Sequence, residues 1–73
     1  MTGPELRTIR KGLGLSVVMF GRALGYQGER NSVAVSVRRY ELGSREIPEH
    51  IARLALMFES FGVPRDFMPR KPD

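Results

Sequence analysis

The chain contains no cysteine and a single histidine among its 73 residues. The lack of cysteine excludes disulfide frameworks and thiolate metal sites. A zinc site is not expected either, because His50 has no cysteine or second histidine to join it. We therefore predict no metal and no cofactor.

Long apolar runs are also missing. No stretch approaches the roughly 18 apolar residues of a membrane-spanning helix. The first residues, MTGPELRTIRKG, lack the apolar core of a signal peptide. We expect a cytoplasmic protein with no membrane partner.

The short length leaves room for one small domain. A chain of this size buries only about 60% of the surface that its unfolded form exposes, so its stability is expected to be marginal. We predict a single domain over residues 4–68 and a disordered tail over residues 69–73. Homodimer formation would add stability to such a domain.

Basic residues are distributed unevenly along the chain. Residues 1–45 hold eight basic and three acidic side chains, whereas residues 46–73 hold four basic and five acidic ones. The first part of the chain is therefore suited to face a polyanion such as nucleic acid. A charge pattern of this kind is equally compatible with an ordinary solvated surface.

Apolar spacing and end signals predict helices in three places. Residues 4–13 carry apolar side chains three and four residues apart, the spacing of one helical face. A second helix is predicted over about 16–24, with Ser16 as its cap and Gly21 allowing another backbone to approach closely. Pro48 suits the start of a last helix. Its apolar face is expected to comprise Ile51, Leu54, Ala55, Phe58 and Phe61.

The segment SVAVSVRRYEL, residues 32–42, fits two patterns. Its three valines alternate as in a half-buried strand, but Val33, Val37 and Tyr40 also recur at helical spacing. A strand needs a partner, and no second alternating segment follows in the chain. We therefore predict a helix over about 32–42, capped by Asn31 and ended by a glycine.

The order of these segments resembles the Cro/repressor-type helix-turn-helix family of bacterial and phage transcription regulators. LRTIRKGLGLSVVMFGRALG is followed by VSVRRYELGSREIPEHIARL, and the resemblance covers about residues 5–61. The family's recognition helix ends in an aromatic residue, an acid and a turn glycine, here Tyr40, Glu41 and Gly43. The resemblance implies an all-α bundle of four to five short helices that binds double-stranded DNA, and a repressor acting as a homodimer on a palindromic operator.

Two features depart from the family pattern. Members commonly carry a polar residue such as glutamine at the places that correspond to Val17 and Ala34 here. The predicted turn from Gly25 to Asn31 is also longer than the roughly three to four residues that a helix-turn-helix usually needs.

The outer side of the predicted recognition helix supplies the candidate DNA contacts. Five residues are predicted to contact bases in the major groove: Ser32, Val35, Ser36, Arg38 and Arg39. Five others are predicted to contact the DNA backbone or to extend the site: Arg22, Gln27, Arg30, Asn31 and Arg45. The alternative is an ordinary solvated helix face with two arginines.

Apolar residues near the carboxyl end exceed what one small core needs, which predicts a partner surface. Met57, Phe67 and Met68 are the candidate homodimer contacts, because Phe58 and Phe61 are expected to face the core. One alternative is a monomer whose carboxyl end folds back over its own core. Another is an antitoxin-type module that binds a partner protein as well as DNA. No acid/base or nucleophile arrangement is visible, so we do not expect an enzyme.

Overall fold

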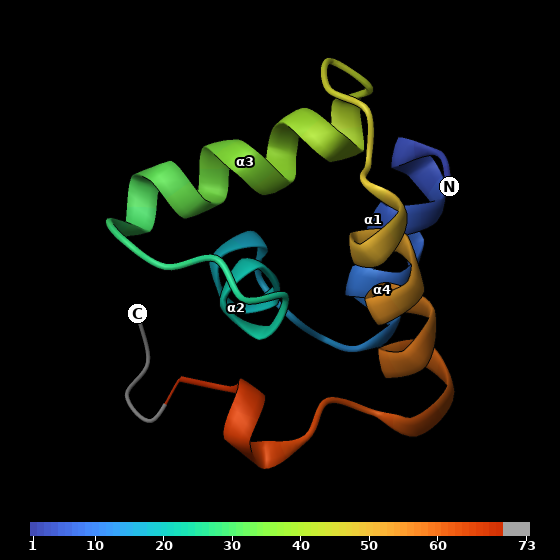
Figure 1. Cartoon of the computed structure of the whole chain (residues 1–73), viewed down its shortest axis with the longest axis vertical. Helices are drawn as coiled ribbons and strands as arrows, with labels where there is room; N and C mark the ends of the chain where they lie inside the picture. Colours follow the sequence, from blue (N-terminus) through green and yellow to red (C-terminus); the bar gives the residue numbers. More distant parts are fainter. Residues whose placement is uncertain (70–73) are drawn as a thin grey trace.

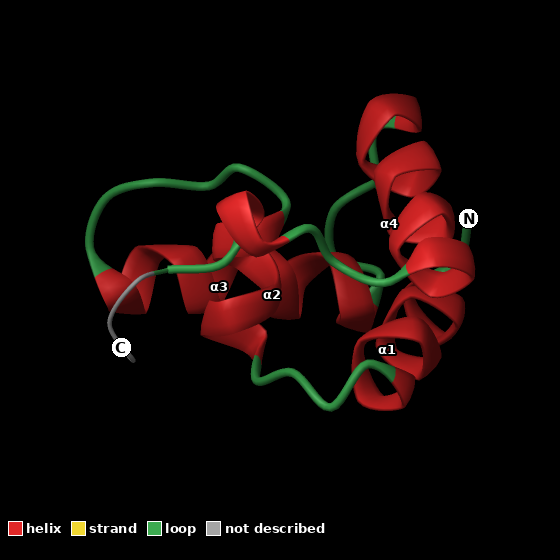
Figure 2. Ribbon diagram, turned by 90° about the horizontal axis from the view of Figure 1, so that it is seen from below, coloured by secondary structure: helices red, strands yellow, loops and turns green. Residues whose placement is uncertain are grey.

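The structure, a computed structural model that describes residues 1–69, is all-helical (Figures 1 and 2). Its elements are α1 (Gly3–Gly12), α2 (Val17–Ala23), α3 (Arg30–Leu42), α4 (Glu49–Phe61) and a short 3-10 helix, η1 (Arg65–Phe67). No strand occurs within residues 1–69. The prediction of an all-α bundle is confirmed, and the ambiguous valine-rich segment is a helix.

Packing contacts of α1 and α3 hold the four helices together. α1 packs against both α3 and α4, and α2 packs against α3 (Figure 1). All four helices contribute buried side chains to one cluster. Its members are Leu6, Ile9, Phe20, Ala23, Leu24, Val37, Tyr40, Ile51, Ala55 and Phe58.

Local signals mark the helix ends. Ser16 Oγ accepts a hydrogen bond from the Met19 amide at 3.1 Å, so the predicted cap of α2 is confirmed. α1 begins with a capping box in which Thr2 Oγ1 accepts from the Glu5 amide and Glu5 Oε1 accepts from the Thr2 amide. These hydrogen bonds to Thr2 lower the pKa of Glu5. Gly43 ends α3 with a φ of 79°, the left-handed conformation predicted for it.

Gly21 lies where α2 crosses α3. A Cβ atom at this position would collide with the Val33 side chain and lie 3.0 Å from Val37 Cγ2. The close approach predicted from Gly21 is therefore confirmed. It brings the backbone of α2 directly against the two valines and turns that face of α3 towards the core.

The start of α3 differs from the prediction. The helix begins at Arg30, and the residue at its N-cap is Glu29, which makes no side-chain capping hydrogen bond. The prediction that Asn31 is the cap is wrong. The reason is that the Val33 amide donates to the Glu29 carbonyl oxygen at 3.1 Å, which closes a helical turn that already contains Asn31. The connection after α2 is correspondingly shorter, over residues 24–29.

The last turn of α4 also differs from the prediction. Ile51, Ala55 and Phe58 are buried as expected, but Phe61 is 85% exposed. Each residue turns the helix by roughly 100°. The side chain of Phe61, six residues after Ala55, therefore points away from the core face that is centred on Ala55. The prediction that Phe61 belongs to the core face is wrong.

The chain returns across its own core after α4. Val63 and Met68 pack against the core cluster. The Phe67 ring lies edge-on to Phe58, with ring centroids 5.8 Å apart. Of the tail that was predicted to be disordered, only Pro69 is among the described residues, and residues 70–73 lie outside them.

Candidate nucleic-acid interface

α3 separates its residues between a buried and a solvent-facing side. The buried side consists of Val33, Ala34, Val37 and Tyr40. The solvent-facing side includes the five predicted base contacts, of which Ser32, Val35, Arg38 and Arg39 are exposed and Ser36 is half-buried. The inward placement predicted for Val33, Val37 and Tyr40 is confirmed.

A shallow groove of about 360 Å³ runs along the solvent-facing side of α3. It is lined by Asn31, Ser32, Val35, Ser36 and Arg39. The Ser36 hydroxyl donates to the Ser32 carbonyl oxygen at 3.1 Å, which holds the Ser36 side chain close to the helix. The groove combines a guanidinium, an amide, hydroxyls and one apolar side chain. It brings together four of the predicted base contacts and Asn31.

Arg38 lies on another flank of α3, next to α1 and the start of α2. There it lines a second hollow, whose other members are Arg7, Arg10, Val17, Glu41 and Leu42. The structure therefore does not group Arg38 with Arg39. Arg7 was not predicted as a site residue; the only sequence signal for it is its position one helical turn before Arg10.

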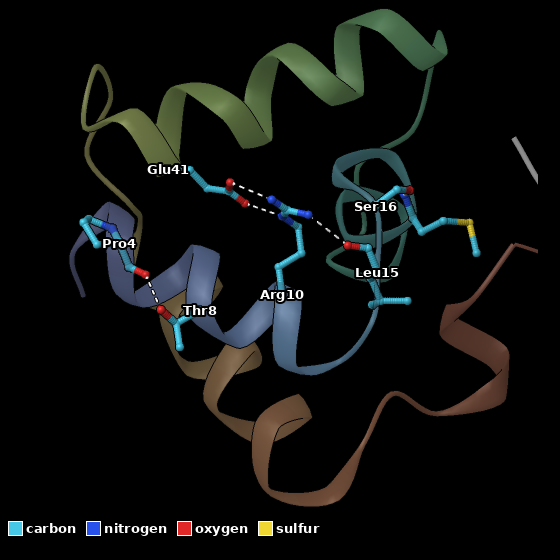
Figure 3. A network of polar contacts seen from close by, with 7 residues as sticks. Pro4, Thr8, Arg10, Leu15, Ser16 and Glu41 are labelled. Atoms are coloured by element: carbon cyan, nitrogen blue, oxygen red, sulfur yellow. Dashed lines mark hydrogen bonds and ion pairs between the residues drawn. The ribbon is translucent and has the colours of Figure 1, made fainter.

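An ion pair fixes the end of α3 against α1. Arg10 Nε lies 2.7 Å from Glu41 Oε2, and Arg10 Nη2 lies 3.2 Å from Glu41 Oε1. Arg10 Nη1 also donates to the Leu15 carbonyl oxygen at 3.0 Å, so one guanidinium joins α1, α3 and the connection before α2 (Figure 3). The two side chains are only 13% and 8% exposed. Glu41, the only carboxylate within α3, is thus paired inside the protein.

A tyrosine pair anchors the connection between α2 and α3. The hydroxyl oxygens of Tyr26 and Tyr40 are 2.5 Å apart, and the ring centroids are 6.2 Å apart. Burial and the hydrogen bond with Tyr40 raise the pKa of Tyr26 to about 12. This connection, which was predicted only as a loop, is therefore tied to the buried side of α3.

The five predicted backbone contacts lie in different places. Arg30 and Asn31 are exposed in the first turn of α3, and Arg45 is exposed in the connection that follows it. Arg22 and Gln27 instead line a hollow beside η1 and the carboxyl-terminal segment. These last two residues line neither of the hollows along α3.

The three predicted dimer contacts also differ in their surroundings. Met57 is 54% exposed on α4. Phe67 is 44% exposed while its edge contacts Phe58, and Met68 is half-buried against the core. Leu56 and Phe61, which were not predicted for this role, are exposed near Met57 in α4.

Within the described part of the chain, no three His, Cys, Asp or Glu side chains lie together in a way that would hold a metal ion. His50 is exposed in the first turn of α4. None of the helices in residues 1–69 has the length and apolarity needed to cross a membrane.

Comparisons with known proteins assign no family to the chain. No family model matches it, and neither a curated protein nor a solved structure gives a significant match.

Proposed function

We propose that this chain binds double-stranded DNA in a sequence-specific manner through the solvent-facing side of α3. The observation that carries the proposal is the charge of that side. Its predicted base contacts are neutral or basic, and the only carboxylate of α3, Glu41, is paired with Arg10. A polyanion that approaches α3 therefore meets three exposed arginines, Arg30, Arg38 and Arg39, and no unpaired acid of that helix.

The size and chemistry of α3 suit the major groove. Its 13 residues form a rod about 20 Å long, and the major groove of B-DNA is wide enough for an α-helix. In that position, Arg39 can bond to a guanine through two donors, Ser32 can bond to several base groups, and Val35 can contact a thymine methyl.

Arginines around the groove suit the phosphates. Arg7 and Arg38 share one hollow, and Arg30 and Arg45 are exposed at the two ends of α3. Contacts of this kind orient a protein on the duplex and supply most of its salt-dependent affinity, but they do not select a sequence.

Together with the resemblance to Cro/repressor-type proteins, this chemistry supports a small bacterial or phage transcriptional regulator in the cytoplasm. We propose a repressor that acts as a homodimer on a palindromic operator. In such a complex, two copies of α3 occupy half-sites about one helical turn, ~34 Å, apart.

The test is selection of duplexes from a random pool with the full-length protein, followed by affinity measurements on the enriched and on random sequences. We expect one enriched motif with two-fold symmetry. Arg65→Ala is the matched control, because Arg65 is an exposed arginine of η1, lies outside α3 and α4, and should not change the motif. Failure to enrich any sequence over the starting pool would contradict the proposal.

An antitoxin-type module that binds another protein through its apolar end is the second candidate. The exposed apolar side chains of α4 favour it. A toxin-sized reading frame beside the gene, whose product forms a stable complex with this chain, would support this candidate over a repressor acting alone.

A further inference from the structure

α4 carries apolar side chains on two opposite sides. The inward side packs into the core through Ile51, Ala55 and Phe58. The outward side exposes Leu56, Met57 and Phe61, by 49%, 54% and 85%. A surface helix normally has one apolar face, and a helix that is apolar on both sides is normally buried. The outward side of α4 is therefore suited to a partner.

Glu59, an exposed carboxylate of α4, lies at the edge next to α1, where it lines a hollow with Glu5. The rest of the outward side of α4 carries no charge excess. Its exposed Arg53 and Glu49 form an ion pair of 3.2 Å within the same helix. This surface thus differs from α3, whose solvent-facing side is basic. Two identical surfaces of α4 can meet without bringing like charges together.

We infer that the outward side of α4 binds a second copy of this chain, with the two α4 helices packed antiparallel about a two-fold axis at Met57. Arg53, Met57 and Phe61 are four residues apart and form one ridge along the helix. An antiparallel two-fold pair centred on Met57 brings each Arg53 opposite Phe61 of the other copy. A guanidinium that lies over an aromatic ring makes an attractive cation–π contact. Because of the two-fold symmetry, the interface contains two such contacts.

This self-complementarity favours a second copy over an unrelated protein. The ridge carries an arginine and an aromatic ring at equal distances on either side of its centre, and an identical antiparallel ridge matches both. A standard interface takes about 800 Å² from each partner. The chain exposes 5034 Å², so an interface of that size would cover about a sixth of its surface.

The surface is inferred from α4 alone, whereas its role at a two-fold symmetric operator rests on the proposed DNA binding. Dimer mass is therefore measured without DNA, so that failure of one proposal is distinguishable from failure of the other. α3 packs against α1 and α2, and its solvent-facing groove is lined by α3 residues only, so an interface on α4 leaves the groove open.

The test uses opposite charges at the two-fold axis. Met57 would meet Met57 of the second copy, so Met57→Lys and Met57→Glu should each weaken self-association by roughly 30-fold or more through like-charge repulsion. An equimolar mixture of the two variants should restore a species of two-chain mass in sedimentation. Met57 is half exposed, so both variants should keep the helical circular dichroism of the unchanged protein.

Leu42→Lys and Leu42→Glu are the matched controls, because Leu42 is 80% exposed at the end of α3 and lies outside the proposed interface. Both should keep the two-chain mass. A single-chain mass for the unchanged protein at every concentration would overturn the inference. Dimers that persist in both Met57 variants, or a mixture that stays dissociated, would overturn the placement of the axis.

Discussion

Arg10 and Glu41 are 31 residues apart in the sequence, and their side chains form a two-point ion pair between α1 and α3. The pair lies at the edge of the hollow that also contains Arg7 and Arg38. It therefore connects the stability of the bundle with the charge of the proposed DNA-binding surface.

Removal of one partner of this ion pair should destabilise the protein. In Glu41→Ala the Arg10 guanidinium, which is largely buried, loses its carboxylate, and we expect a loss of about 3 kcal/mol in the free energy of unfolding. Urea unfolding followed by circular dichroism measures this loss. Glu49→Ala is the control, because the Arg53–Glu49 pair is about 80% exposed and contributes no more than about 0.5 kcal/mol. Equal losses in the two variants would show that burial of the Arg10 pair has no energetic role.

The two flanks of α3 should affect DNA binding differently. Arg39 lines the groove with Ser32 and Val35, so Arg39→Ala should cost about 1–3 kcal/mol at the selected site and relax the preference at one base position. Arg7→Ala and Arg38→Ala should each weaken binding to selected and random duplexes alike. Each should also reduce the slope of log affinity against log salt concentration by about one. Affinity measured on both duplexes over a salt series separates the two effects. A uniform loss for Arg39→Ala would contradict its role in sequence selection.

Stability should decrease at alkaline pH because of Tyr26. The pKa of this hydroxyl is raised from 10.0 to about 12 in the folded protein, so the folded state holds the proton more tightly than the unfolded state does. The resulting stabilisation is complete below pH 10.0 and is lost as the pH rises towards about 12. Ultraviolet titration of tyrosinate, combined with urea unfolding across this range, tests the prediction. In Tyr26→Phe the high-pH titration step and its share of the pH dependence should both be absent.

Gly21→Ala should destabilise the contact between α2 and α3. The added Cβ would collide with Val33 and press against Val37, and overpacking of this kind costs about 1–3 kcal/mol. Gly12→Ala at the end of α1 is the control, because its Cβ would have no neighbour within 4 Å and alanine is the better helix former. Thermal unfolding of both variants provides the comparison. Similar melting temperatures for the two would show that the helices can separate slightly at no cost.

Local patterns predicted the helices, whereas contacts between distant residues were not predictable. The inward spacing of Val33, Val37 and Tyr40 and the Ser16 cap depend on neighbours within one or two turns, and the sequence contains that information. The partner of Arg10 depends on how α1 meets α3, which no local pattern specifies.

Two residues illustrate the limits of the periodic patterns. Tyr26 was assigned to a loop because glycines surround it, and its hydrogen bond with Tyr40 follows only from the three-dimensional position of the connection. Phe61 continues the apolar spacing of α4, but the helix has turned away from the core by that residue. For the candidate site, the sequence predicted the exposed residues of α3 but not their division between two flanks.

The separation of α3 into two sides has an evolutionary consequence. Val33, Val37 and Tyr40 maintain the bundle, while Ser32, Val35 and the other groove residues contribute no member of the core cluster. Under the proposed DNA binding, substitutions in the groove should therefore alter the recognised sequence without altering whether the chain folds. On the same proposal, a lineage can acquire new recognition sequences by drift at these few positions, and a laboratory library restricted to them should retain a high fraction of folded members.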